Sequence, residues 1–176
     1  MAVSYNIATH GVCFPTKILS GNIGHVLNIT IDKDMDNGSF VKVGDWIELD
    51  RYKADTATTI SAVVRGKSAR GNWYVEITGD CGDTVLLYQD PIIEEANWGK
   101  RWLSEANFYN AKGDTVRAYP LEKYDIIELS YDSFDGVPTV GSVITSVSNG
   151  KMSVGSSSSN SVVGNAIVGT STVSGG

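Results

Sequence analysis

Two histidines and two cysteines are the residues of this chain best suited to metal binding or nucleophilic chemistry: His10, Cys13, His25 and Cys81. A structural zinc site takes four such ligands at short spacings, and here only His10 and Cys13 are close together in the sequence. The two thiols could form a disulfide, but no secretory signal indicates an oxidising compartment. The sequence therefore favours two separate thiols, at least one of them buried, and we expect neither a metal site nor a cofactor.

Acidic residues at alternate positions, Asp32, Asp34 and Asp36, resemble the first part of a calcium-binding loop. Such a loop has a glycine at its sixth position and a bidentate carboxylate at its twelfth, but Asn37 and Val43 stand there. A solvated acidic loop tip explains the three carboxylates equally well, and it is the interpretation that we favour.

A hydrolytic site finds little support in the sequence. A Ser-His-Asp triad would have to use His10 or His25, and the chain has no G-x-S-x-G segment to carry the serine. Pairs of carboxylates for a glycosidase, such as Glu94 and Glu95, are uninformative in a chain with 20 acidic residues. We therefore expect a protein that is not an enzyme.

Four tryptophans could contact a ligand or a partner. Trp46 and Trp73 fall in predicted strands and are expected to pack, whereas Trp98 and Trp102 lie close to Arg101. Tryptophan serves both protein interfaces and platforms on which sugars stack. Because no acidic or amide partner for sugar hydroxyls stands out nearby, we favour Trp98, Arg101 and Trp102 as residues of a protein interface.

The charge balance restricts the class of partner. The chain has 176 residues, of which 14 are basic and 20 acidic, so its net charge is −6. Proteins that track nucleic-acid phosphates or bind anionic membranes normally have the opposite sign, so we expect neither nucleic acid nor membrane as a partner. No stretch reaches the ~20 consecutive apolar residues of a spanning helix. Residues 1–20 lack the basic head and apolar run of a secretory signal.

Most of the chain alternates apolar and polar residues with a period of two, which is typical of half-buried β-strands. Asn37-Gly38 between the first two predicted strands indicates a tight turn, and thus a β-hairpin. Many short strands at this spacing predict an all-β protein built from one or two small barrel or sandwich units. The predicted strands cover residues 27–31, 40–50, 58–65, 72–78, 84–89, 115–119, 125–131 and 141–148.

Composition also suggests a division of the chain. We expect an extended N-terminal arm at 1–23, a first β unit at 24–89 and a second β unit at 104–150. The connector at 90–103 fits either a short helix or an irregular loop, because Asp90-Pro91 suits a helix start while Gly99 interrupts it.

The tail at 151–176 is rich in serine and glycine and has no charged residue beyond Lys151. An uncharged, β-prone segment in water would be an aggregation hazard, so we expect it to add a strand to a sheet of its own or of a neighbouring subunit. The candidate contact residues of this tail are Val162, Val163, Ile167 and Val168.

A five-residue pattern occurs twice, as DWIEL at 45–49 and as DIIEL at 125–129. Short patterns of this kind arise by chance in β proteins, so a duplicated unit and a coincidence are equally good explanations.

Residues 107–121, with the sequence NFYNAKGDTVRAYPL, are followed by YDIIELS at 124–130. This stretch resembles a recurring element of small tailed-phage structural proteins, in which a G-x-x-V-R-A-Y-x-L-x-x-G-D segment precedes a β-strand. Tyr124 stands where a glycine is commoner in that element. The resemblance covers about a quarter of the chain. It implies a capsid decoration (cement or head auxiliary) protein, bound outside a capsid lattice, often at junctions between capsomers and sometimes as a trimer.

We therefore expect a structural virion protein that decorates and stabilises a phage head and is assembled in the host cytoplasm. Its partner would be the major capsid protein, with self-association, for instance as a trimer. The arm and the tail have the composition of segments that add strands to a neighbour. A receptor- or carbohydrate-binding β module on the phage head or tail is the alternative, and a small wall-degrading hydrolase is a second one.

Overall fold

The computed structural model describes residues 10–91 and 105–155, and the regular structure within these ranges is almost all β, as predicted. Besides the strands, this part of the chain contains the five-residue helix α1 (Leu19–Ile23) and the 3-10 turns η3 (Glu105–Asn107) and η4 (Tyr131–Ser133). The strands are β1 (Cys13–Lys17), β2 (Leu27–Thr30), β3 (Phe40–Trp46), β4 (Tyr52–Thr56), β5 (Ala62–Lys67), β6 (Trp73–Ile77), β7 (Thr84–Leu87), β8 (Thr115–Pro120), β9 (Ile126–Leu129), β10 (Phe134–Asp135), β11 (Val143–Ser148) and β12 (Lys151–Val154).

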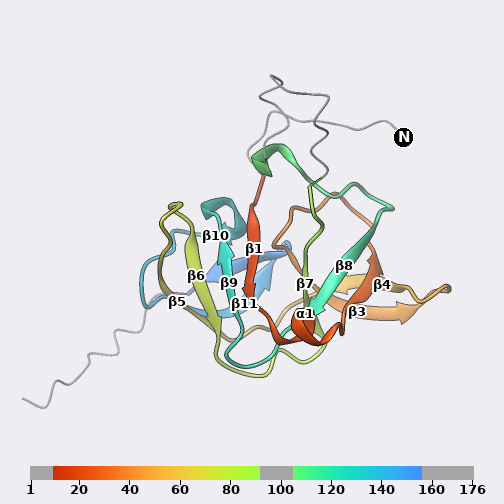
Figure 1. Cartoon of the computed structure of the whole chain (residues 1–176), viewed down its shortest axis with the longest axis horizontal. Coiled ribbons are helices and arrows are strands. Elements are labelled where there is room, and N and C mark those ends of the chain that lie inside the picture. The colour runs from red at the N-terminus through yellow and green to blue at the C-terminus, as the bar shows by residue number, and fades with distance from the viewer. Residues whose placement is uncertain (1–9, 92–104, 156–176) are drawn as a thin grey trace, which may run out of the picture.

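The strands form two sheets that lie side by side (Figure 1). One is an open sheet of seven strands in the order β1-β9-β6-β5-β11-β12-β10. The other is a closed barrel in the order β2-β4-β3-β7-β8. Most neighbours are antiparallel, and β2–β4 and β10–β12 are the parallel pairs among the described strands.

Two apolar cores correspond to the two sheets, and β3 and β7 contribute to both. Val85 and Leu87 of β7 point into the barrel, whereas Leu86 packs in the core of the seven-stranded sheet. Phe40 and Val41 of β3 divide in the same way. All four residues of β7 are buried because this wall of the barrel is covered by the seven-stranded sheet. This explains why β7 is a continuous apolar run rather than an alternating one.

The division into two successive β units, 24–89 and 104–150, does not match the sheets. The first range supplies β2, β3, β4 and β7 to the barrel but β5 and β6 to the seven-stranded sheet. The second supplies β8 to the barrel, and β9, β10 and β11 to the seven-stranded sheet. The chain crosses between the sheets repeatedly, so the two cores are built from interleaved segments.

The predicted hairpin at Asn37-Gly38 is wrong, although both strands and the turn exist. β2 pairs with β4 and β8, whereas β3 pairs with β4 and β7, so the two strands are not hydrogen-bonded to each other. Gly38 has the positive φ expected of a turn, 82°, and the Ser39 amide donates to the Asp36 carbonyl at 3.2 Å. A Cβ at Gly38 would lie 2.8 Å from a Leu129 methyl carbon, which leaves room for glycine alone.

The loop between β2 and β3 is held instead by buried amides. The Asn37 side chain donates to the Gln89 carbonyl at 2.7 Å and accepts from the Gln89 amide at 3.0 Å. The Asn110 side chain donates to Asn37 Oδ1 at 3.2 Å and to the Met35 carbonyl at 3.3 Å. Both asparagines are buried. The turn therefore joins the loop to the end of β7 and to the segment before β8.

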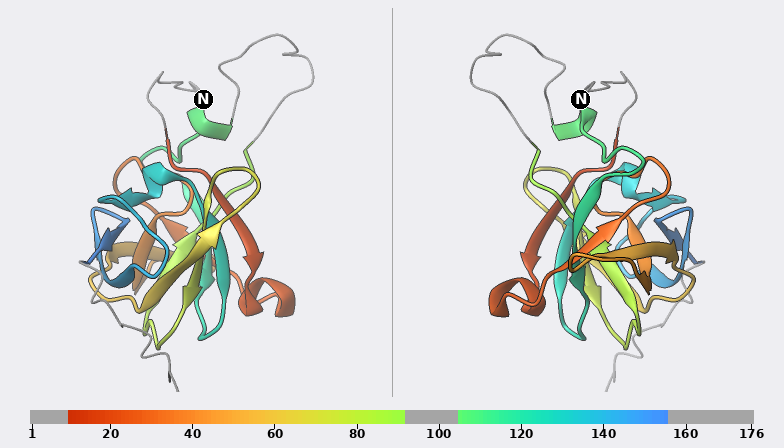
Figure 2. Two further views of the ribbon diagram at one scale, coloured as in Figure 1. Left: turned by 90° about the vertical axis from the view of Figure 1, so that its left-hand side faces the viewer. Right: turned by 90° about the vertical axis from the view of Figure 1, so that its right-hand side faces the viewer.

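Residues 13–23 are not an extended arm. β1 pairs with β9 at the edge of the seven-stranded sheet, and Cys13 and Ile18 are buried in its core. α1 follows at the periphery of the molecule, visible as the short red helix in Figure 2. The Leu19 amide at its start donates to the buried carboxylate of Asp125 at 3.0 Å.

The range assigned to the tail also begins inside the fold. β12 pairs with β10 and β11, and its Met152 is fully buried. Residues 1–9, most of the predicted connector (92–103) and the rest of the tail (156–176) lie outside the described residues, so the added strand in the tail stays a prediction.

Candidate docking surface

The interface residues predicted from the sequence lie outside the described residues. Trp98, Arg101 and Trp102 fall within 92–104, and the tail residues Val162, Val163, Ile167 and Val168 fall within 156–176. Their role in contacts remains a prediction.

The two cysteines are separate, buried thiols, as the sequence favoured. Burial, and then the charge of Glu128, raises the pKa of the Cys13 thiol far above its usual range. Burial likewise raises the pKa of the Cys81 thiol. A thiol is a poor nucleophile when its thiolate is disfavoured, so the surroundings of both residues suit packing rather than covalent chemistry.

Two of the three carboxylates of the calcium-like sequence hold loops together. Asp34 accepts the Lys112 amide at 2.8 Å, and Asp36 accepts the Gly11 amide at 2.9 Å and lies 2.7 Å from His10 Nδ1. Within 10–91 and 105–155, no three His, Cys, Asp or Glu side chains are placed to share a metal ion. Asp32 and Asp34 are exposed, as expected of a solvated tip, whereas Asp36 is half-buried and is a loop anchor.

His10 lies between Asp36 and the ring of Tyr109, which stacks on it with 5.0 Å between ring centroids. Its Nδ1 donates to the carboxylate, because a carboxylate oxygen can only accept. His10 Nε2 and Ser133 Oγ are buried, and neither has a hydrogen-bond partner in the described part of the chain. His25 is exposed. The structure therefore brings together one histidine and one aspartate, and this pair ties the segment before β1 to the loop at Asp36.

The described pockets are small or open. A depression of about 310 Å³ beside the turn at 80–83 has a polar lining that includes Lys42, Asp80, Asp83 and the edge of Cys81. A second hollow, of about 70 Å³, lies between Asp32, Asp55 and Gly150. In the larger depression the Cys81 thiol has the raised pKa described above, which disfavours its reactive thiolate.

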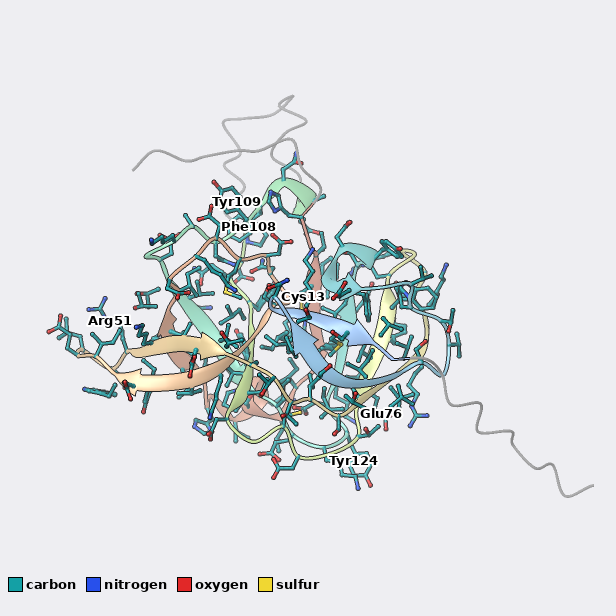
Figure 3. The ribbon with its side chains drawn as sticks, turned by 180° about the vertical axis from the view of Figure 1, so that it is seen from behind. Cys13, Arg51, Glu76, Phe108, Tyr109 and Tyr124 are labelled. Carbon is teal, nitrogen blue, oxygen red and sulfur yellow. The ribbon has the colours of Figure 1, made fainter. Side chains whose placement is uncertain are left out.

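The most distinctive surface feature is the hairpin formed by β3 and β4, which extends beyond the barrel (Figure 1). Arg51 marks its end in Figure 3, far from the rest of the molecule. Trp46, Ile47 and Leu49 are exposed there, by 55%, 45% and 81%. We call residues 45–51 the hairpin tip.

The hairpin closes with a two-residue turn. The Arg51 amide donates to the Glu48 carbonyl at 3.1 Å, and the Ile47 amide donates to the Arg51 carbonyl at 2.9 Å. The two central residues, Leu49 and Asp50, have φ of 50° and 59°. Two positive φ values in a two-residue turn match the right-handed twist of the flanking strands, which is why this turn closes hairpins.

Trp46 does not pack in a core, contrary to expectation. It lies opposite Tyr52 of β4, and the two rings meet edge to face at 5.2 Å between centroids. Trp73 fulfils the expectation for a packed residue: it is partly buried against the core of the seven-stranded sheet, with the Lys67 ammonium 4.6 Å from its ring. The tryptophan at 46 is therefore held by one neighbour while most of its surface faces solvent.

Acidic side chains border the apolar residues of the hairpin tip. Asp45, Glu48 and Asp50 are exposed, and Arg51 reaches Glu48 Oε1 at 3.5 Å. Three carboxylates and one guanidinium leave the hairpin tip with a formal charge of −2. The surface therefore combines apolar contact area with negative charge, which suits recognition of another macromolecule.

The sequence contained no signal for this tip. Val41, Val43, Ile47 and Leu49 continue one alternating pattern, which predicted a strand through to Asp50. The turn residues are Leu-Asp rather than the Asn-Gly that marks such turns. The sequence therefore does not indicate this hairpin, which is defined by the pairing of β3 with β4.

Comparisons with known proteins add no relative: no family model, no curated protein and no solved structure matches the chain. Within the described residues, no helix has the length and apolar character needed to cross a membrane.

Proposed function

We propose that this chain is a structural virion protein that decorates a phage capsid by binding the outer surface of the head lattice. The observation that carries the proposal is the hairpin tip, where Trp46, Ile47 and Leu49 are exposed at the end of a projection from the barrel (Figure 3). A protein that docks on a preformed shell needs apolar side chains held outside its own core, and this hairpin holds them there.

The resemblance of residues 107–121 and 124–130 supports the same class of protein. These residues form β8, in the wall of the barrel, and β9, which lies between β1 and β6 in the seven-stranded sheet. The similar segment is thus part of the scaffold, and the docking residues lie elsewhere on it.

In this proposal the partner is the major capsid protein, and the protein acts in the virion after assembly in the host cytoplasm. It binds without chemical catalysis and without a cofactor. Copies of the chain associate with one another, for instance as a trimer, where capsomers meet. The parts of the arm predicted at 1–23 and of the tail predicted at 151–176 that lie outside the described residues supplement the hairpin tip, together with Trp98, Arg101 and Trp102.

Sedimentation with capsids tests the proposal. Heads assembled from the major capsid protein of the genome that encodes this chain are mixed with the purified protein and pelleted. We expect the protein to pellet with the heads and to saturate in proportion to the number of capsomers. A chain that stays in the supernatant, or that binds in only a handful of copies, contradicts decoration. Binding to a glycan array by the isolated protein, without binding to heads, would favour the receptor-binding alternative.

Truncation tests the predicted contact segments separately. Ending the chain after Gly155 keeps β12 intact, because this strand ends at Val154. Beginning it at His10 keeps β1. We expect each truncated protein to fold, as judged by circular dichroism, and to bind heads more weakly. The same loss is expected for Trp98→Ala with Trp102→Ala, and unchanged binding by all three proteins would reject these segments as contacts.

A further inference from the structure

The turn at the hairpin tip is made from residues that suit it poorly. A two-residue turn with both central φ values positive favours Asn-Gly, because side chains with a Cβ are strained in the left-handed region. Here a leucine occupies the first central position, with φ of 50°. Asp50, the second, tolerates this region better, since its short polar side chain can hydrogen-bond locally.

The same leucine contributes nothing visible to packing. Leu49 is 81% exposed, more than any other large apolar side chain in the described residues. Neither the backbone geometry nor the interior of the fold therefore explains a leucine at this position. A contact between Leu49 and another molecule would explain both the strained backbone and the exposed apolar side chain.

The charges around Leu49 indicate the chemistry of that molecule. The carboxylates of Asp45, Glu48 and Asp50 surround the apolar residues, and one of the three is within ion-pair distance of Arg51. A complementary surface would have an apolar floor and a basic rim. A second copy of the chain is a poor candidate, since its net charge is −6. An anionic membrane is disfavoured for the same reason.

We infer that the hairpin tip inserts Leu49, flanked by Trp46 and Ile47, into an apolar recess of a partner protein whose rim carries lysine or arginine. The inference rests on the proposed function in one respect: the recess belongs to the assembled head lattice. What it adds is that Leu49 contributes to binding although it strains the turn, and that the acidic border orients the contact.

The decisive variant is Leu49→Asn with Asp50→Gly, which gives the turn its preferred residues and removes the apolar side chain. We expect its Tm to rise by a few degrees, because the turn is no longer strained. We expect its affinity for heads to fall by about tenfold or more, as when a central apolar anchor is removed. Val137→Asn with Val140→Asn is the matched control, since these valines are 67% and 65% exposed on another loop. It should leave the affinity unchanged.

Charge reversal tests the basic rim. Asp45→Lys should weaken binding to heads and reduce its dependence on salt, because an attractive pair becomes repulsive. Asp135→Lys, an exposed carboxylate on β10, should change neither quantity.

The outcomes separate the two claims. If the unmodified protein fails to pellet with heads, the proposed function is overturned, and the inference falls with it. If the unmodified protein pellets but the Leu49→Asn/Asp50→Gly protein binds equally well, the function stands and the inference is overturned. Two further results overturn the inference when binding to heads is unchanged. In one, the double substitution abolishes self-association in analytical ultracentrifugation. In the other, it abolishes flotation of the protein with phosphatidylcholine vesicles.

Discussion

Phe40 of β3 lies opposite Leu86 of β7, and both side chains leave the barrel to pack in the core of the seven-stranded sheet. Their neighbours Val41 and Val85, which also face each other, point into the barrel. β3 and β7 thus form part of the barrel wall, and they also contribute buried side chains to the core of the seven-stranded sheet. This relationship makes the two sheets one structural unit.

Truncating this pair should therefore destabilise both sheets. Phe40→Ala removes a fully buried ring, so we expect the free energy of unfolding to fall by about 3–5 kcal/mol. Urea unfolding of protein labelled with 5-fluorotryptophan and followed by ¹⁹F NMR distinguishes Trp46, on the barrel hairpin, from Trp73, on the other sheet. The resonances of Trp46 and Trp73 should report one midpoint of unfolding, and that midpoint should move to a lower urea concentration in the variant. Different midpoints for the two tryptophans would show that the sheets unfold independently.

The buried amides that hold the loop between β2 and β3 give a second prediction. Asn110→Ala removes the donor to Asn37 Oδ1 and to the Met35 carbonyl, in a place that excludes water. We expect the free energy of unfolding to fall by about 1–3 kcal/mol, the usual result of leaving buried polar groups without partners. Asn22→Ala is the control, because Asn22 is exposed on α1. Equal stability of the two variants in chemical denaturation would contradict the role of the network.

The raised pKa of both thiols predicts low reactivity in the native protein. At pH 8 we expect slow reaction of Cys13 and Cys81 with a thiol reagent such as dithionitrobenzoate, because the reactive thiolate is scarce and access is restricted. In denaturant both thiols should react at once, without a reducing agent. A Cys13→Ser protein assigns the remaining signal to Cys81. Rapid native labelling, or no labelling of unfolded protein until a reductant is added, would contradict two buried free thiols.

The ion pair between Arg65 and Glu76 on neighbouring strands predicts a pH effect. Arg65 Nε lies 2.9 Å from Glu76 Oε2, and this hydrogen bond lowers the pKa of the Glu76 carboxyl. A carboxyl with a lower pKa in the folded state adds stability above its unfolded pKa of about 4.3, and the contribution is lost as the pH falls through the folded value. Since the pair is largely exposed, we expect less than about 1 kcal/mol.

Arg65→Ala should raise the pKa of Glu76 toward its ordinary range, measured by ¹³C NMR titration of the side-chain carboxyl. Arg70→Ala provides the control, because that guanidinium lies over the ring of Phe14 rather than beside Glu76. A Glu76 pKa that is the same in all three proteins would contradict the assigned cause.

The positions of many strands could be predicted because local alternation reflects which face of a strand is covered. Val75 and Ile77 of β6 are fully buried, and Tyr74 and Glu76, which alternate with them, are partly exposed, as the period of two indicated. β4 was missed because its residues, YKADT, include one buried side chain, Ala54. A strand whose other residues face solvent has little apolar pattern to detect.

The pairing of strands could not be predicted in the same way. Asn37-Gly38 made a convincing turn, yet β2 found its partners in β4 and β8. Pairing depends on which segments, distant in sequence, cover one another's apolar faces, and no local pattern carries that information. The candidate docking surface was missed for this reason, since it arises where β3 and β4 extend past the barrel.

The repeated pattern at 45–49 and 125–129 shows which properties follow from the sequence and which follow from the tertiary structure. In both copies the sequence by itself determined a tendency to form a strand, since β3 reaches Trp46 and β9 begins at Ile126. Only the tertiary structure decided their burial: Leu129 lies in β9 between β1 and β6 and is fully buried, whereas Leu49 is 81% exposed in a turn. Alternation sets the direction of successive side chains, but a side chain leaves water only when another strand or sheet covers it.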